Sequence, residues 1–121
     1  MSKTLTFLHG TTVERAQTLS QSQNFLMEQT YFVLGANNRP TAEFFAERAA
    51  SREPRGGGPA FVLVEVEEDT VNSLRRNGWL KLTTFDVADD PRLQNRTQWL
   101  LEAPGVPILN RELIDMTWEQ L

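Results

Sequence analysis

The stretch Leu5-Thr6-Phe7-Leu8-His9-Gly10-Thr11-Thr12 passes from an apolar strand pattern to a histidine, a glycine and two hydroxyl residues. Residues 4–8 alternate weakly and predict a short β-strand that ends at His9, the single histidine of the chain. Gly10 lacks a Cβ and would let a ligand approach the backbone, while the imidazole could donate to a hydroxyl. The alternative is a histidine that closes the strand, with one of the two threonines as the N-cap of the next helix.

Composition limits the class of protein. The 121 residues are 40% hydrophobic and 23% charged, which predicts one globular domain over residues 1–121. A net charge of -4 argues against a protein whose main role is binding nucleic acid. With no cysteine and one histidine, neither a disulfide nor a Cys- or His-rich metal site is expected. No long apolar run or signal-peptide pattern is found, so we expect no membrane span and a cytoplasmic location.

Hydrophobic periodicity predicts the remaining elements. Helices are expected at residues 13–22, 41–50 and 69–78, and strands at 30–34, 60–66, 79–82, 96–102 and 111–118. Thr12 and Thr41 are the expected N-caps of the first two helices, and Gly78 the C′ residue of the third. The strand over 60–66 is apolar on both faces and should be central. This pattern predicts an α+β fold with mostly antiparallel strands and two or three short helices.

Two groups of arginines stand out in this acidic chain. They are Arg48-Arg52-Arg55 and Arg75-Arg76. We interpret both groups as solvated helix and loop surface. The neighbouring Gly56-Gly57-Gly58 predicts a flexible loop, but no Gly-Lys-Ser/Thr follows it, so it is not a P-loop.

The order of the motifs resembles the ADP-ribosyltransferase superfamily over roughly residues 5–117. A strand with His-Gly-Thr precedes a helix, the Tyr31-Phe32 strand, a turn, an alanine-rich helix opened by Pro40-Thr41-Ala42, and a long apolar strand. The chain is most similar to the branch that holds poly-ADP-ribose polymerase catalytic domains, minimal bacterial toxin-type transferases and RNA 2′-phosphotransferases. The resemblance implies a split pair of mostly antiparallel sheets.

The resemblance also implies an NAD site, with NAD as substrate. His9 would bind the adenosine ribose, the Gly10 backbone the nicotinamide amide, and Tyr31 the nicotinamide ring. The aromatic residue that covers the nicotinamide from the other side has its counterpart in Phe44 or Phe45. The other residues that match binding positions are Thr11, Phe32 and Thr41.

A late strand of this family usually begins with a glutamate, and Gln98 occupies that place here. Glutamine can accept a hydrogen bond from a ribose hydroxyl but supplies no negative charge to the sugar cation that forms as nicotinamide leaves. Glu102 lies four residues further along the strand, and Glu65 and Glu67 lie in the long apolar strand; each is a weaker substitute. The catalytic set implied is therefore His9, Tyr31 and Gln98.

These residues imply an ADP-ribosyltransferase-like protein, a glycosyltransferase that passes ADP-ribose to a macromolecular acceptor or cleaves NAD. A toxin or effector with a neutralising protein partner (an antitoxin) would fit this size. One alternative is a binding module in which catalysis is lost at Gln98. Another is an RNA 2′-phosphotransferase relative, disfavoured because the arginines are loosely placed in sequence. A third is an interaction protein anchored by the tryptophans Trp79, Trp99 and Trp118.

Overall fold

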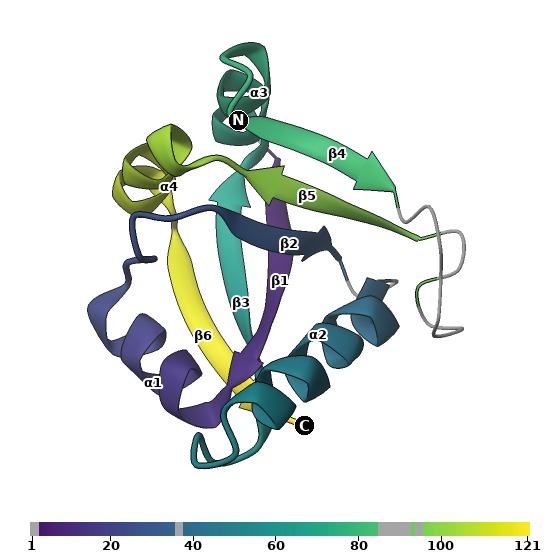
Figure 1. Ribbon diagram of the computed structural model, residues 1–121. Helices are drawn as coiled ribbons and strands as arrows, with labels where there is room; N and C mark the ends of the chain where they lie inside the picture. The colour runs from purple at the N-terminus through teal and green to yellow at the C-terminus, as the bar shows by residue number, and fades with distance from the viewer. Residues whose placement is uncertain (1–2, 36–37, 85–92, 94–95) are drawn as a thin grey trace.

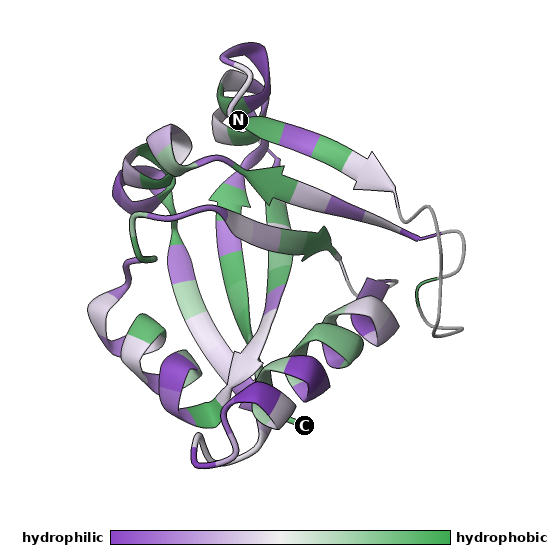
Figure 2. Ribbon diagram, in the orientation of Figure 1, coloured by the Kyte–Doolittle hydropathy of each residue, from purple (hydrophilic) through white to green (hydrophobic). Residues whose placement is uncertain are grey.

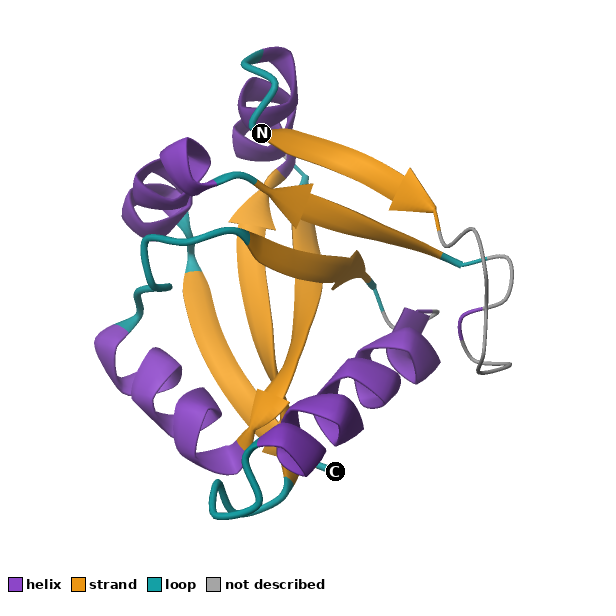
Figure 3. Ribbon diagram, viewed as in Figure 1, coloured by secondary structure: helices purple, strands orange, loops and turns teal. Residues whose placement is uncertain are grey.

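The chain forms an antiparallel sheet with helices packed around it (Figures 1 and 3). The computed structural model describes residues 3–35, 38–84, 93 and 96–121. The strands are β1 (Thr4–Thr12), β2 (Thr30–Leu34), β3 (Pro59–Glu67), β4 (Leu80–Thr84), β5 (Thr97–Leu101) and β6 (Asp115–Gln120). The helices are α1 (Val13–Ser22), α2 (Arg39–Arg52), α3 (Glu68–Arg76) and α4 (Val106–Glu112), with a 3-10 turn, η3 (Ala103–Gly105). The predicted α+β class is confirmed.

The strand order is β4-β5-β2-β1-β3-β6, and each neighbouring pair is antiparallel. Strands β1 and β3 pair without interruption from Thr4↔Glu67 to Thr12↔Pro59. Strand β2 instead divides its pairing: Val33 and Leu34 pair with β1, and residues 30–32 pair with β5. In Figure 1, β1, β3 and β6 cross the direction of β2, β5 and β4. The resemblance implied a split pair of sheets. The structure instead has one continuous sheet that changes direction at β2.

Hydrophobic residues cover both faces of the central strands. Figure 2 shows apolar colour along β1 and β3, whereas α1 and α2 mix apolar and hydrophilic residues. The larger core lies on the face with α1, α3 and α4 and includes Phe7, Phe32 and Val64. A smaller cluster, Leu8, Val33, Ala42 and Phe61, lies on the face covered by α2. Strand β3 is an interior strand between β1 and the edge strand β6. It is buried on both faces over residues 60–62, whereas Glu65 and Glu67 are exposed.

The first strand is longer than its sequence pattern indicates. β1 continues to Thr12 because the ladder with β3 extends to Pro59. His9 therefore lies within the strand, and the prediction that the strand ends there was wrong. The predicted N-cap of α1 is confirmed, since the Thr12 Oγ1 accepts a hydrogen bond from the Arg15 amide at 3.3 Å.

Helix α2 starts earlier than expected. Asn38 is its N-cap residue and Pro40 lies in its first turn, so the prediction that Thr41 caps the helix was wrong. Proline is common in the first turn of a helix because its fixed φ suits the helix and an N–H there would have no partner within the helix. Thr41 lies inside the helix and is fully buried. The C′ residue of α3 is as predicted, with Gly78 at a φ of +74°.

The prediction of a last strand over residues 111–118 was wrong for the first half of that range. Residues 106–112 form α4, and β6 begins only at Asp115. The apolar residues Val106 and Leu109 stand three apart and are both buried, which is helical spacing. The Asn110 side chain then bonds both backbone groups of Phe25, at 2.7 Å to its N–H and 3.0 Å to its carbonyl, and so fixes the α1–β2 connection.

The acidic connection predicted over 86–95 lies outside the described residues except for position 93. In the part of the chain that is described, no helix combines the length and apolar character needed to cross a membrane.

Helix α2 lies directly against β1 at Gly10. A Cβ at this glycine would lie 2.6 Å from the Ala42 carbonyl oxygen, 2.6 Å from the Ala46 nitrogen and 2.9 Å from the Phe45 Cβ. Two of these atoms belong to the helix backbone, so a side-chain rotation cannot relieve the clash. The glycine therefore sets how closely α2 approaches the sheet.

We expect Gly10→Ala to lower the free energy of unfolding by about 1–3 kcal/mol, because the added methyl must push α2 away from β1. Urea unfolding followed by circular dichroism measures this change. Thr117→Ala is the matched control, since it introduces the same residue at an exposed position of edge strand β6 and should cost less than about 0.5 kcal/mol. Equal effects of the two substitutions would contradict the packing constraint.

Candidate functional site

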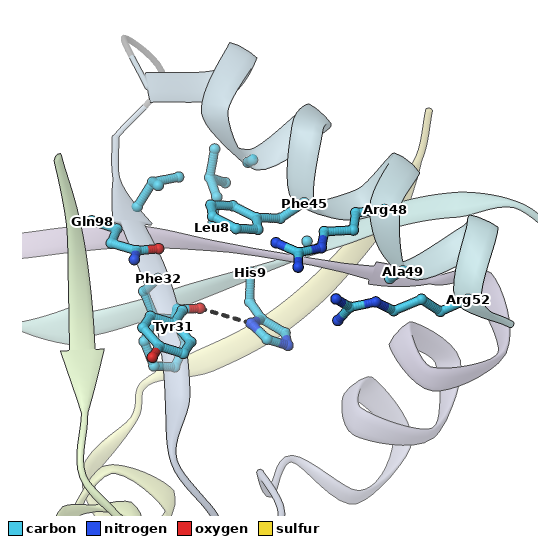
Figure 4. A pocket seen from close by; sticks show the side chains of 12 residues that line it. Leu8, His9, Tyr31, Phe32, Phe45, Arg48, Ala49, Arg52 and Gln98 are labelled. Atoms are coloured by element: carbon cyan, nitrogen blue, oxygen red, sulfur yellow. Dashed lines mark hydrogen bonds between the residues drawn. The ribbon is translucent and has the colours of Figure 1, made fainter. Parts of the chain in front are cut away.

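A pocket of about 470 Å³ lies where β1 and β2 separate, beneath α2 (Figure 4). This volume is within the range of small-molecule sites. Four separate segments, β1, β2, α2 and β5, supply its walls. The lining residues are Leu8, His9, Gly10, Tyr31, Phe32, Val33, Ala42, Phe45, Arg48, Ala49, Arg52 and Gln98.

The sheet is open at this point. The Thr6 carbonyl accepts a hydrogen bond from the Gly35 amide, so the backbone groups of Thr6 face β2. Backbone groups alternate along a strand and β1 has no bulge against β3, so the amide and carbonyl of Leu8 and Gly10 face the same side. The β1–β2 ladder includes Leu8 but ends there. The Gly10 backbone therefore faces an edge of β1 from which β2 has departed.

His9 lies across this opening. Its Nδ1 is 2.8 Å from the backbone oxygen of Tyr31, the carbonyl that would otherwise face Gly10 in a longer ladder. A carbonyl only accepts, so Nδ1 carries the proton and donates it. In the neutral ring the Nε2 is then an acceptor. The expectation that His9 donates to a hydroxyl is thus corrected, because in this tautomer the other ring nitrogen can only accept a hydrogen bond.

The surroundings of the ring favour its neutral form. Burial lowers the pKa of His9 below its ordinary value, and the Arg15 charge lowers it further; the hydrogen bond to Tyr31 and the Glu28 charge oppose this. The rings of Phe25 and Phe32 lie against the imidazole, each with centroids 5.7 Å away. His9 is only partly exposed, at the base of the pocket.

The two aromatic residues of β2 have different positions. Tyr31 is 41% exposed and its ring lines the pocket, where it can contact a ligand. Phe32 is buried and packs edge-to-face with Phe25 at 5.2 Å. Phe32 thus forms the floor of the pocket and packs against the His9 ring. It was expected to bind the ligand directly, but its position is a supporting one.

Phe45, not Phe44, is the aromatic residue of α2 that lines the pocket. Thr41 and Thr11, both expected to bind, are buried and do not line this pocket. Thr11 instead lines a neighbouring hollow between α1 and the α1–β2 connection, which also includes His9 and Tyr31.

Gln98 enters the pocket from β5, opposite α2 (Figure 4). Its Oε1 is buried and has no hydrogen-bond partner among the described residues. An unpaired buried amide oxygen destabilises the protein, so this atom is available to a donor from a ligand.

The carboxylates considered as substitutes for Gln98 lie elsewhere. Glu102 interacts with Lys81 at 3.7 Å and with Gln29 at 3.4 Å, while Glu65 and Glu67 are exposed on β3. None of the three lines the pocket.

Two residues of the pocket were missed by the sequence interpretation. Arg48 and Arg52 are exposed on α2, as the sequence indicated, but they also extend toward the space above His9, as Figure 4 shows. They lie three and seven residues after Phe45, on the same helical face. Placing Phe45 in the site would have placed both arginines there as well.

The three tryptophans do not form an exposed anchor. Trp79, Trp99 and Trp118 are partly buried and pack against the main core. Trp99 also contacts Phe7 edge-on at 6.5 Å and lies beneath the Arg75 guanidinium at 5.1 Å. Their contacts are those of core and edge packing.

No group of three or more His, Asp or Glu side chains suited to a metal ion occurs among residues 3–35, 38–84, 93 and 96–121. No protein-family model, curated protein or solved structure matches the chain.

The lowered pKa of His9 predicts a pH-dependent stability. The unfolded chain binds the histidine proton more tightly, so this contribution to stability is complete above the ordinary histidine pKa of about 6.5 and is lost as the pH falls through that value toward the lowered one. Urea unfolding between about pH 8 and pH 5 should show the wild type losing stability relative to His9→Asn. Asparagine keeps a donor near Nδ1 but does not titrate, so parallel pH profiles would contradict this prediction.

Proposed function

We propose that this chain is an ADP-ribosyltransferase-like protein that binds NAD in the pocket between β1, β2, α2 and β5. The observation that supports this most is the gathering of His9, Gly10, Tyr31, Phe45 and Gln98 in one pocket from four separate segments. The resemblance of the sequence assigns each of these residues to an NAD site. Composition and hydrophobic patterning do not require them to meet.

Each of these residues suits one part of NAD. The Nε2 of His9 is an acceptor for a ribose hydroxyl, since its Nδ1 is bound to Tyr31. The backbone amide and carbonyl of Gly10 face the open edge and match the carbonyl and amino groups of a carboxamide. Tyr31 and Phe45 provide aromatic surfaces for the nicotinamide ring.

The proposed reaction breaks the bond between the nicotinamide nitrogen and C1′ of its ribose. The bonding electrons leave with nicotinamide, a nucleophile forms the new bond to C1′, and its proton passes to solvent. A hydroxyl of a macromolecular acceptor gives ADP-ribosylation, and water gives NAD cleavage. Gln98 would accept a hydrogen bond from the ribose and hold it in place, but its amide adds no negative charge to the sugar as the bond breaks.

The unpartnered oxygen of Gln98 favours a second candidate, a module that binds NAD without cleaving it. Both candidates use the same pocket and the same contacts to the ribose. They differ only in whether nicotinamide is released, so binding and release must be measured separately.

NAD at about 100 times its dissociation constant should stabilise the wild type by about 2.7 kcal/mol and raise its Tm by several degrees. His9→Asn should fold and show a much smaller rise, because it keeps a donor for the Tyr31 carbonyl but loses the Nε2 acceptor. Scanning calorimetry with and without NAD measures both. An unchanged Tm of the folded wild type in millimolar NAD would reject both candidates.

Replacing Gln98 by glutamate should increase nicotinamide release at least about tenfold, because a carboxylate stabilises the ribose as positive charge develops. Chromatography of the reaction mixture measures the released nicotinamide. Gln98→Leu is the control of similar size, which removes the amide and should weaken NAD binding without raising release. A Gln98→Glu variant that binds NAD but releases no more nicotinamide than the wild type would contradict the position assigned to this residue.

A further inference from the structure

Arg48 and Arg52 lie one helical turn apart on the face of α2 that lines the pocket. Side chains four residues apart on a helix are neighbours, with Cβ atoms about 5–6 Å from each other. Figure 4 shows the Arg48 guanidinium above His9 and the Arg52 guanidinium on the side of His9 away from Gln98. The resemblance described above gives neither residue a role.

These arginines are the charged residues of the pocket. The other described lining residues are apolar, aromatic or neutral polar, and no carboxylate is among them. A chain with a net charge of -4 thus has a pocket wall of positive charge. Such a wall attracts and holds an anion.

Neither side chain has a partner among the described residues. No ion pair or hydrogen bond joins Arg48 or Arg52 to any residue among 3–35, 38–84, 93 and 96–121. Two other arginines do have carboxylate partners: Arg15 binds Glu53, and Arg39 binds Glu43 and Glu119. Two like charges at this spacing destabilise a helix slightly, so the helix itself gains nothing from the pair.

We propose that Arg48 and Arg52 form a phosphate-binding subsite of this pocket, and that its ligand is a nucleotide whose diphosphate lies between them. Arginine presents a planar fork of N–H donors that fits phosphate oxygens in pairs. Two such forks one helical turn apart provide donors for two linked phosphoryl groups. The arginines line the same pocket as His9 and Gln98. A diphosphate bound by them would join the two riboses that these residues contact.

This inference rests on the proposed function only for the identity of the dinucleotide. The arginine pair would bind inorganic pyrophosphate or ADP-ribose even if NAD were not the natural ligand. Adenosine and nicotinamide riboside lack a phosphate and provide the neutral comparison.

Isothermal titration of the full chain with ADP-ribose, pyrophosphate, adenosine and NAD tests the subsite. Arg48→Gln/Arg52→Gln should bind ADP-ribose and pyrophosphate at least about tenfold more weakly than the wild type, since each lost charge-assisted bond weakens binding severalfold or more. Adenosine binding should change little. Raising the salt concentration should weaken ADP-ribose binding to the wild type more than to the variant.

Arg76→Gln/Arg111→Gln is the matched control. It removes the same total charge at exposed positions of α3 and α4 outside the pocket, and should leave each affinity unchanged. Glutamine is a good helix former, so both double variants should fold, and circular dichroism checks this.

The outcomes separate the two proposals. Weaker pyrophosphate binding in the pocket variant, with no NAD binding by the wild type, supports the phosphate subsite and rejects the NAD site. Equal ADP-ribose and pyrophosphate affinities of the pocket variant and the wild type overturn the subsite, even where NAD binds. An equal loss in the control variant also overturns it, because the effect would then come from net charge alone.

Discussion

The contact between Gly10 and α2 is the constraint on which the site depends. With 2.6 Å from the position of a Cβ to two backbone atoms of the helix, β1 can carry no side chain at this point. The glycine was expected to admit a ligand, but the space beside its Cα is filled by α2. The close approach fixes the position of the helical face that carries Phe45, Arg48 and Arg52. Gly10 therefore has two different sides: its Cα faces the helix, and its amide and carbonyl face the open edge, where the proposed ligand would bind.

That open edge follows from the way β2 divides its pairing. β2 pairs with β1 only at Val33 and Leu34, while its residues 30–32 pair with β5, so part of β1 is left uncovered. His9 compensates by donating to the Tyr31 carbonyl, which would otherwise lack its partner in the ladder. The same bond fixes the tautomer of the ring. One hydrogen bond thus satisfies a strand carbonyl where the ladder ends and leaves an acceptor in the pocket.

Sequence patterns predicted the elements whose periodicity is strong and local, such as β2, β3 and α1. They failed where contacts with other elements determine where a strand or helix begins and ends. β1 is extended by its ladder with β3, and the strand expected over residues 111–118 begins only at Asp115 because α4 continues to Glu112. The pocket residues His9, Tyr31 and Gln98 were found through a family resemblance. Arg48 and Arg52 were missed because an arginine on a surface helix gives no sign of what lies opposite it, and only the position of α2 supplies that.

The charges of the pocket would favour binding of the proposed nucleotide over cleavage of its glycosidic bond. A neutral His9, an amide at Gln98 and two arginines leave no negative group among the described lining residues. If the arginines bind a diphosphate, they also neutralise the charge by which that diphosphate would stabilise a positive ribose. Each guanidinium that strengthens binding of the diphosphate would then also slow cleavage of the bond to the ribose. A site built in this way should retain its ligand well and cleave it slowly, and a single carboxylate at position 98 is the smallest change that would restore the balance.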